Sequence, residues 1–311
     1  MTPVLGALCV LIAVLIPSTA IAEGACEDVA ISGTPRLSIA DAYSPFAAAD
    51  LTALTTVTIQ NAGDDACPLA AVFAAADNGR MRNAGETLSY TLETPDGAAL
   101  LNGPGIADPE AGHHIDLTLS GGQAASLSVR ARVPAQQMAP PGGYADNTAV
   151  IRLYRMPADG FPALLTERPF PVSTEVAAVC RLSPPQPATL DFTSDIGPDA
   201  RPQGRPRSAL MPEAACNTGA RLKLSGRALA RDGEVPAGFD DVIDFVARAR
   251  LRSVAATLVT RGTEEVAAQS ARAGTNGTAE PVKLDVQLRP GRPLAAGRYQ
   301  TVLTIALEPS P

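Results

Sequence analysis

The chain has 311 residues and a formal net charge of −7. This length suits two domains of roughly 150 residues, each large enough to bury a core. The acidic balance argues against nucleic acid or an anionic membrane surface as the main partner. With 26 glycines, 28 prolines and no tryptophan, the composition favours short strands between turns over long helices.

Residues 1–22 predict an export signal that is cleaved. The apolar run from Val4 to Ile16 is shorter than the ~20 residues that span a membrane. Ala20-Ile21-Ala22 supplies the small-x-small pattern of a cleavage site, so the mature chain is expected to begin at Glu23 and not to insert into the membrane. An uncleaved anchor is the alternative, because residues 1–22 carry no Lys or Arg.

Two stretches of the chain repeat each other. Gly143-Tyr144 and Gly297-Arg298-Tyr299 each form a turn, and each is followed by a β-branched alternation that predicts a strand. Two cysteines keep the same register, since Cys26 lies 118 residues before Tyr144 and Cys180 lies 119 before Tyr299. The third landmark is an aromatic residue 54 positions before each tyrosine, Tyr90 and Phe245. Three landmarks in register predict two tandem modules, which we place at residues 23–173 and 174–311.

The mature chain retains four cysteines, and an even count in an exported protein implies disulfides. Four cysteines allow three pairings, and the repeat selects the one in which each module closes its own bridge. The predicted disulfides are Cys26–Cys67 and Cys180–Cys216. Free buried thiols are the alternative.

Apolar alternation and β-branched residues predict about seven strands in module one. They fall at residues 29–39, 55–61, 69–75, 88–93, 115–119, 126–134 and 143–154. Residues 163–172 could add one more strand, whose prolines suit only an edge position. This spacing is typical of an antiparallel sandwich.

Module two follows the same plan and ends with the strand after Tyr299. Its other strands are expected at residues 188–192, 220–226, 242–252, 255–260 and 282–288. Residues 197–207 and 267–280 are rich in Pro, Gly or small polar residues and are expected to form loops.

Residues 128–150 resemble the spore coat protein U domain, the module of Csu-type archaic chaperone–usher pilins. The matching string runs Arg-Val-Pro-Ala-Gln-Gln and then Pro-Pro-Gly-Gly-Tyr. Residues 289–299 match the same frame more loosely, so the resemblance covers nearly all of the mature chain. It implies two immunoglobulin-like sandwiches and a pilin fold that lacks one strand. It also implies three partners: a periplasmic chaperone, an outer-membrane usher and an adjacent pilin subunit that lends the missing strand.

Module one contains its own candidate last strand at 163–172, whereas module two ends at Pro311, a few residues past its Tyr299 strand. We therefore expect module two to accept a strand. Only residues 23–25 precede Cys26, about 10 Å of extended chain at ~3.3 Å per residue, which is too short to donate one. By resemblance, such a two-domain subunit is the tip adhesin of a pilus. It would pass through the periplasm to the cell surface and act in adhesion and biofilm formation, with module one as the distal binding domain.

No cofactor, metal or catalytic site is expected. The two histidines, His113 and His114, are adjacent, and neighbouring side chains on a strand point to opposite faces. Candidate adhesive loops carry exposed apolar residues: Pro45, Phe46, Leu100, Leu101 and Ile106. The alternative is that these residues pack back on their own sheet.

Two other functions remain open. The first is a stand-alone extracellular or coat structural protein with the same fold and no strand exchange. The second is a secreted hydrolase, which would have to use His113 or His114 and lacks a nucleophile motif.

Overall fold

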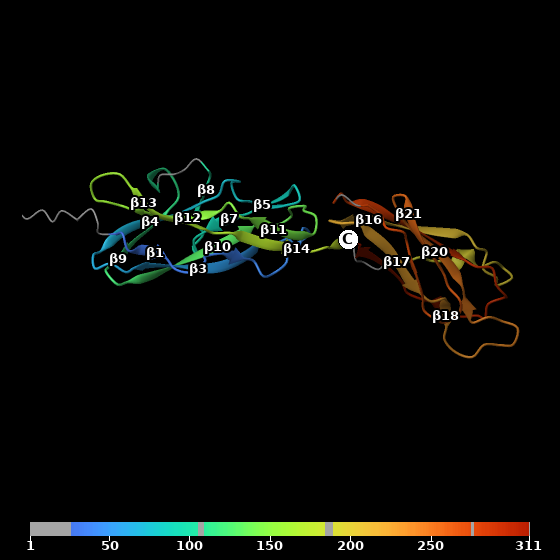
Figure 1. The fold of residues 1–311 in the computed structure, drawn as a ribbon. Coiled ribbons are helices and arrows are strands. Elements are labelled where there is room, and N and C mark those ends of the chain that lie inside the picture. Colours follow the sequence, from blue (N-terminus) through green and yellow to red (C-terminus); the bar gives the residue numbers. More distant parts are fainter. Residues whose placement is uncertain (1–25, 105–108, 184–188, 275–276, 311) are drawn as a thin grey trace, which may run out of the picture.

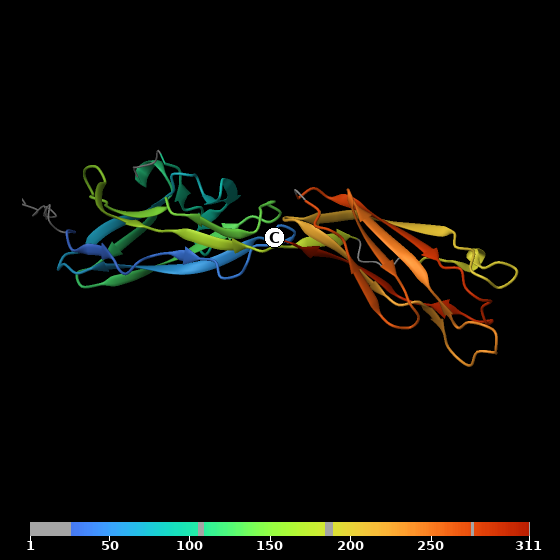
Figure 2. The ribbon, with the colours of Figure 1, turned by 45° about the vertical axis from the view of Figure 1, so that its right-hand side comes forward.

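The computed structural model describes residues 26–104, 109–183, 189–274 and 277–310. They form two β lobes laid end to end (Figures 1 and 2). Helix within these residues is limited to two short 3-10 turns, η1 (Pro109–Ala111) and η2 (Thr193–Asp195). The protein is therefore all-β, as predicted. No helix in the described part is long and apolar enough to cross a membrane, and the expected export signal lies outside that part.

Lobe one (residues 26–176) contains the strands that the sequence assigns to module one. They are β1 (Val29–Ile31), β2 (Leu37–Ser38), β3 (Leu51–Asn61), β4 (Cys67–Ala74), β5 (Arg80–Asn83), β6 (Glu86–Ser89), β7 (Thr91–Glu93), β8 (Leu101–Asn102), β9 (Ile115–Leu119), β10 (Ala124–Val133), β11 (Gly142–Asp146), β12 (Val150–Arg155), β13 (Ala163–Pro169) and β14 (Val172–Val176).

These strands form three sheets whose inner faces share one apolar core. Their orders are β1-β3-β10-β7, β2-β14-β11-β5-β6 and β13-β12-β4-β8, with β9 also on β4. Inward positions alternate along the long strands, as the β-branched pattern requires. For example, Val129, Ala131 and Val133 of β10 are buried between exposed or half-buried neighbours.

Lobe two (residues 180–310) has its own core. Its strands are β15 (Cys180–Ser183), β16 (Pro206–Cys216), β17 (Ala220–Gly226), β18 (Leu229–Arg231), β19 (Val242–Ile243), β20 (Phe245–Leu251), β21 (Val254–Val259), β22 (Val266–Gln269), β23 (Glu280–Leu288), β24 (Tyr299–Gln300) and β25 (Leu303–Pro309). The sheet orders are β15-β16-β23-β20-β21, β22-β17-β25 and β19-β18-β24.

The two lobes repeat one pairing scheme. The sequence β1-β3-β10-β7 in lobe one corresponds to β15-β16-β23-β20 in lobe two, and β12 on β4 corresponds to β25 on β17. Tyr90 and Phe245, the aromatic landmarks of the repeat, are both buried. The structure joins Cys26 to Cys67 and Cys180 to Cys216, which are the pairs predicted from the repeat.

The boundary between the lobes lies later than residue 173. Strand β14 pairs with β11 as far as Val176, which lies opposite Gly142. Val172 and Val176 are both in the core of lobe one, so inward alternation carries this sheet three residues past the predicted boundary. The link between the lobes is therefore Ala177–Val179.

Several predicted single strands are pairs of strands in different sheets. The stretch 143–154 divides into β11 and β12, 88–93 into β6 and β7, 163–172 into β13 and β14, and 242–252 into β19 and β20. In 88–93 and 242–252 the apolar alternation continues while the backbone crosses from one sheet to another, so side-chain alternation alone does not reveal the crossing. In 143–154 the crossing falls at the polar residues Asn147 and Thr148.

Six strands were not predicted: β5, β8, β15, β16, β18 and β22. Strand β16 begins inside the Pro-rich stretch 197–207 and carries Pro206 at its first residue, a position where proline is tolerated. The predicted strand 188–192 is wrong in its described part, where residues 189–192 lie in no strand; residue 188 lies outside the described residues.

Candidate strand-accepting edge of lobe two

The sheets of lobe two end one strand earlier than those of lobe one. In lobe one, β12 lies between β4 and β13. Its counterpart β25 pairs with β17 from Leu303, opposite Gly226, to Pro309, opposite Ala220. The described residues supply no strand on the other side of β25.

The second sheet shows the same difference. In lobe one, β11 lies between β5 and β14. In lobe two, β24 pairs with β18, and no other described strand pairs with it. The run Tyr299–Pro309 therefore has one continuous side without a strand in either sheet, and we refer to this run as the open edge.

Side-chain burial follows from the missing strand. In lobe one, Ile151 and Leu153 of β12 are both 0% exposed. In lobe two, the alternating residues Leu303, Ile305 and Leu307 of β25 are only half-buried, although they pack against the core of their lobe. An unpaired strand with a partly wet apolar face is the arrangement that folded proteins avoid unless something covers it.

Further apolar side chains of lobe two are only partly buried against its core, on β15, on β16 and in the segment 190–196, which lies in no strand. They are Leu182, Leu190, Phe192, Ile196, Ala209 and Met211. Strand β15, which carries Leu182, runs close to β25 without pairing with it. An added strand beside β25 would therefore meet apolar side chains from both layers of the sandwich.

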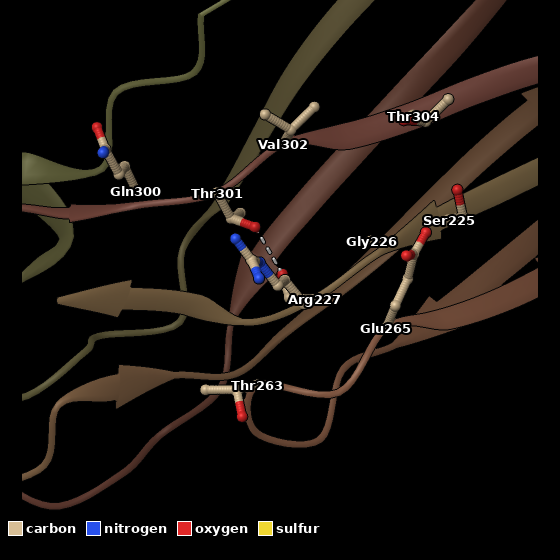
Figure 3. Close-up of a pocket in the computed structure, with 9 residues that line it drawn as sticks. All are labelled: Ser225, Gly226, Arg227, Thr263, Glu265, Gln300, Thr301, Val302 and Thr304. Carbon is tan, nitrogen blue, oxygen red and sulfur yellow. Dashed lines mark hydrogen bonds between the residues drawn. The ribbon is translucent and has the colours of Figure 1, made fainter. Parts of the chain in front are cut away.

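A cavity of about 560 Å³ adjoins the open edge where the chain crosses from β24 to β25. Figure 3 shows Gln300, Thr301 and Val302 on one side and Arg227 with Glu265 on the other. Thr301 Oγ1 donates a hydrogen bond to the Arg227 carbonyl at 2.9 Å. The lining is mostly polar and contains no histidine or cysteine.

The predicted turn tyrosines anchor their turns. The Tyr144 hydroxyl donates to the Pro140 carbonyl at 3.1 Å, and the Tyr299 hydroxyl donates to the Ala295 carbonyl at 3.0 Å. Each bond reaches back four residues, as in the tyrosine corner of immunoglobulin-like sandwiches.

The turn glycine that corresponds to Gly297 is Gly142, the residue before Gly143. Gly142 has φ 134° and Gly297 has φ 156°, both in the region that favours glycine. The two positions are also related by the interval of 155 residues that separates Tyr144 from Tyr299.

The predicted adhesive loops do not form one apolar surface. Pro45 and Leu100 are buried, and Leu101 pairs with Phe73 in a sheet. Phe46 lies at the junction with lobe two, under the Arg181 guanidinium at 5.6 Å. Ile106 lies outside the described residues. Of the described four, Pro45 and Leu100 are buried, whereas Phe46 and Leu101 are half-buried.

The most exposed large apolar side chain in the described residues was not predicted. Phe161 is 90% exposed in the β12–β13 hairpin, and Leu164 of the same hairpin is 53% exposed. This hairpin lies at the end of lobe one away from lobe two (Figure 1). Phe161 lies between Gly160 and Pro162 and belongs to no alternating apolar pattern, so no signal for it is present in the sequence.

A buried acid was also missed. Asp146 is 2% exposed and accepts hydrogen bonds from the Tyr90 hydroxyl at 2.8 Å and from the Thr148 amide at 2.8 Å. The repeat contains a signal for the pair formed by Tyr90 and Asp146, because the residues 155 positions later are Phe245 and Thr301. Lobe two therefore lacks both the tyrosine hydroxyl and the carboxylate.

The candidate chemical residues do not assemble into a site. His114 Nδ1 lies 3.2 Å from the Gly112 carbonyl, and the His113 backbone bonds with the Asn102 side chain. No group of three or more potential metal ligands occurs in the described part of the chain. Arg250 and Arg252, on and directly after β20, form ion pairs with Asp285 and Glu280.

No protein-family model and no curated protein matches the sequence. Solved structures with similar folds include the CsuC–CsuE chaperone–tip adhesion subunit pre-assembly complex of archaic Csu pili from Acinetobacter baumannii. It is 13% identical at a TM-score of 0.48, covering 90% of this chain and 100% of that one. A chaperone–tip adhesin complex of CFA/I fimbriae is 9% identical (TM-score 0.32, 90% and 98% covered). A mutant of the CFA/I adhesin CfaE from enterotoxigenic E. coli is also 9% identical (TM-score 0.29, 92% and 79% covered).

Proposed function

We propose that this protein is an exported subunit of a chaperone–usher pilus and that lobe two receives a strand from another polypeptide. The observation that supports this proposal is the open edge. Lobe one fills both equivalent positions with its own β13 and β14, whereas Tyr299–Pro309 has no neighbour on that side in the described residues. Strand addition would supply backbone hydrogen bonds and cover Leu303, Ile305 and Leu307.

Lobe one indicates how to test this proposal. Its hairpin connects β12 to β13 through residues 156–162 and continues into β14. A second copy of residues 156–176, appended after Pro311, can therefore follow the same path beside β25 and β24. We expect it to raise the thermal midpoint of lobe two by about 10 °C or more, because it buries several apolar side chains, and to abolish binding of a hydrophobic dye.

The control is the same appended copy carrying Phe170→Asp and Val172→Asp, which removes its two most buried apolar residues. This version should leave the midpoint and the dye binding unchanged. A mature chain that is monomeric, binds no dye and gains nothing from the intact copy would instead support the stand-alone coat protein.

The position of the proposed subunit is the tip, with lobe one as the adhesive domain. Support comes from the β12–β13 hairpin, which exposes Phe161 and Leu164 at the end far from the open edge. We expect Phe161→Ser to reduce retention on alkyl-coated beads by about tenfold, given the ~1.5–3 kcal/mol of a buried phenylalanine. Phe239→Ser, at an exposed position in lobe two, is the control. Equal retention for both variants would remove the adhesive role from this hairpin.

A further inference from the structure

The link between the lobes is short and hydrogen-bonded along its length. The Val179 backbone amide donates to Asn217 Oδ1 at 2.9 Å, and the Asn217 backbone amide donates to the Val179 carbonyl at 3.2 Å. Cys180 follows Val179, and Cys216 precedes Asn217. These two cysteines lie opposite each other in the pairing of β15 with β16 and are joined by a disulfide. The end of the link is therefore fixed to lobe two covalently and by two hydrogen bonds.

The side chain of Asn217 reaches beyond its own lobe. It is 7% exposed, and its Nδ2 donates to the Ala177 carbonyl at 2.7 Å and to the Ala139 carbonyl at 3.0 Å. Ala139 is in lobe one and is itself buried. Both donors and the acceptor of this amide are thus in use, and a buried carbonyl loses its partner if the amide is removed.

Among the described residues, the contacts that also cross the junction include the following two. The Arg181 guanidinium of β15 lies over the Phe46 ring of lobe one at 5.6 Å. The Met138 side chain of lobe one lies over Gly277 of lobe two, so close that a β-carbon on Gly277 would collide with it. Arg181 and Met138 are both substantially exposed. These contacts are therefore weaker than the hydrogen bonds of the buried Asn217 side-chain amide.

Lobe one contains a chemically matched asparagine. Asn61, the last residue of β3, is 0% exposed, and its Nδ2 donates to the carbonyls of Asp65 and Leu119 at 2.7 and 3.2 Å. Its Oδ1 accepts from the Gly63 amide at 3.1 Å. Every one of these partners lies within lobe one. Asn61 and Asn217 are therefore both buried amides whose donors and acceptor are all in use, but of the two only Asn217 connects the lobes.

We propose that Asn217 is the residue that locks the orientation of the two lobes, so that the molecule moves as one rod. Without its amide, the lobes remain joined by the three residues Ala177–Val179 and by the two exposed contacts. The disulfide keeps lobe two closed at this end in either case. This proposal does not depend on strand acceptance by lobe two.

The test is NMR on the mature chain with both disulfides formed. Residual dipolar couplings of the wild type should fit one alignment tensor for both lobes. In Asn217→Ala the lobes should require separate tensors, with at least a twofold smaller magnitude in one lobe. Asn61→Ala loses an equivalent set of hydrogen bonds and should keep the common tensor.

Two results would overturn the proposal. One is a common tensor in Asn217→Ala, and the other is separation of the tensors to the same extent in Asn61→Ala, which would point to general loosening. If lobe two of Asn217→Ala fails to fold, Asn217→Asp serves in its place, because it keeps an acceptor for the Val179 amide but has no donor for the carbonyls of Ala139 and Ala177. Wild-type alignment in a folded Asn217→Asp variant would likewise count against the lock.

Discussion

Replacing Phe170 with alanine is expected to lower the free energy of unfolding of lobe one by about 3–5 kcal/mol. Phe170 is fully buried between β13 and β14, where its ring contacts Phe73 edge-on with centroids 5.1 Å apart. Its amide also donates to the Ala149 carbonyl at 2.8 Å, at the point where β11 gives way to β12. Phe170 thus anchors the segment that completes lobe one.

Chemical denaturation followed by a probe confined to lobe one measures this effect. Phe161→Ala is the matched control, because it removes the same side chain from an exposed position of the same hairpin, and its effect should stay within ~0.5 kcal/mol. Near-equal losses from the two variants would show that β13 and β14 do not complete lobe one as described. The same denaturation should also show increased dye binding by Phe170→Ala, because β12 then becomes an exposed edge.

The second large effect is expected at Tyr90, whose hydroxyl donates to the buried carboxylate of Asp146 at 2.8 Å. Burial, the Asp146 charge and this hydrogen bond together raise the pKa of Tyr90 well above its ordinary value of 10.0. Tyr90→Phe leaves Asp146 one donor short. It should cost about 1.5–3 kcal/mol at neutral pH, the range for a hydrogen bond to a charged group.

The pH dependence gives this variant a signature. The folded protein keeps the Tyr90 proton when the unfolded chain has lost it, so the stabilisation is complete below pH 10.0 and falls as the pH rises above that value. The slope is about 1.4 kcal/mol per pH unit for one tyrosine. In Tyr90→Phe the free energy of unfolding should lack this contribution to its pH dependence.

Tyr144→Phe is the comparison for this measurement. The Tyr144 hydroxyl donates to a neutral carbonyl, that of Pro140, so its loss should cost less, about 0.5–1.5 kcal/mol. Equal costs for the two variants at neutral pH, or an unchanged alkaline slope in Tyr90→Phe, would contradict the role given to the Asp146 pair.

The sequence predicted the all-β class, the two modules, the cysteine pairs and the shortage of one strand in module two. These features follow from intervals between landmarks and from alternation, which a single sequence displays directly. The half-buried state of Leu303, Ile305 and Leu307 agrees with the expectation that module two is open on one side.

The crossings between sheets could not be predicted in the same way. From Leu88 to Leu92 the apolar alternation remains regular, although β6 ends at Ser89 and β7 begins at Thr91 in another sheet. The interlobe role of Asn217 depends on the carbonyl of Ala139, 78 residues away in the chain, and no local pattern records such a distance. The burial of Leu100, which was predicted to be exposed, could not be predicted for the same reason. The local sequence of an apolar loop does not show whether a sheet covers it.

If lobe two accepts a strand as proposed, the direction of β25 determines where the lending chain can lie. The last residues of β25 lie beside Ala220 and Gly219, and the C-terminal mark in Figure 1 stands at the waist between the lobes. A lent strand that runs antiparallel to β25, as β13 runs to β12, enters at this waist and leaves past β24, at the opposite pole. If that strand lies before the folded domain of the lending chain in its sequence, this domain follows beyond the far end of lobe two. The two lobes and the lending domain then lie in one line. A parallel strand would place the same domain against lobe one.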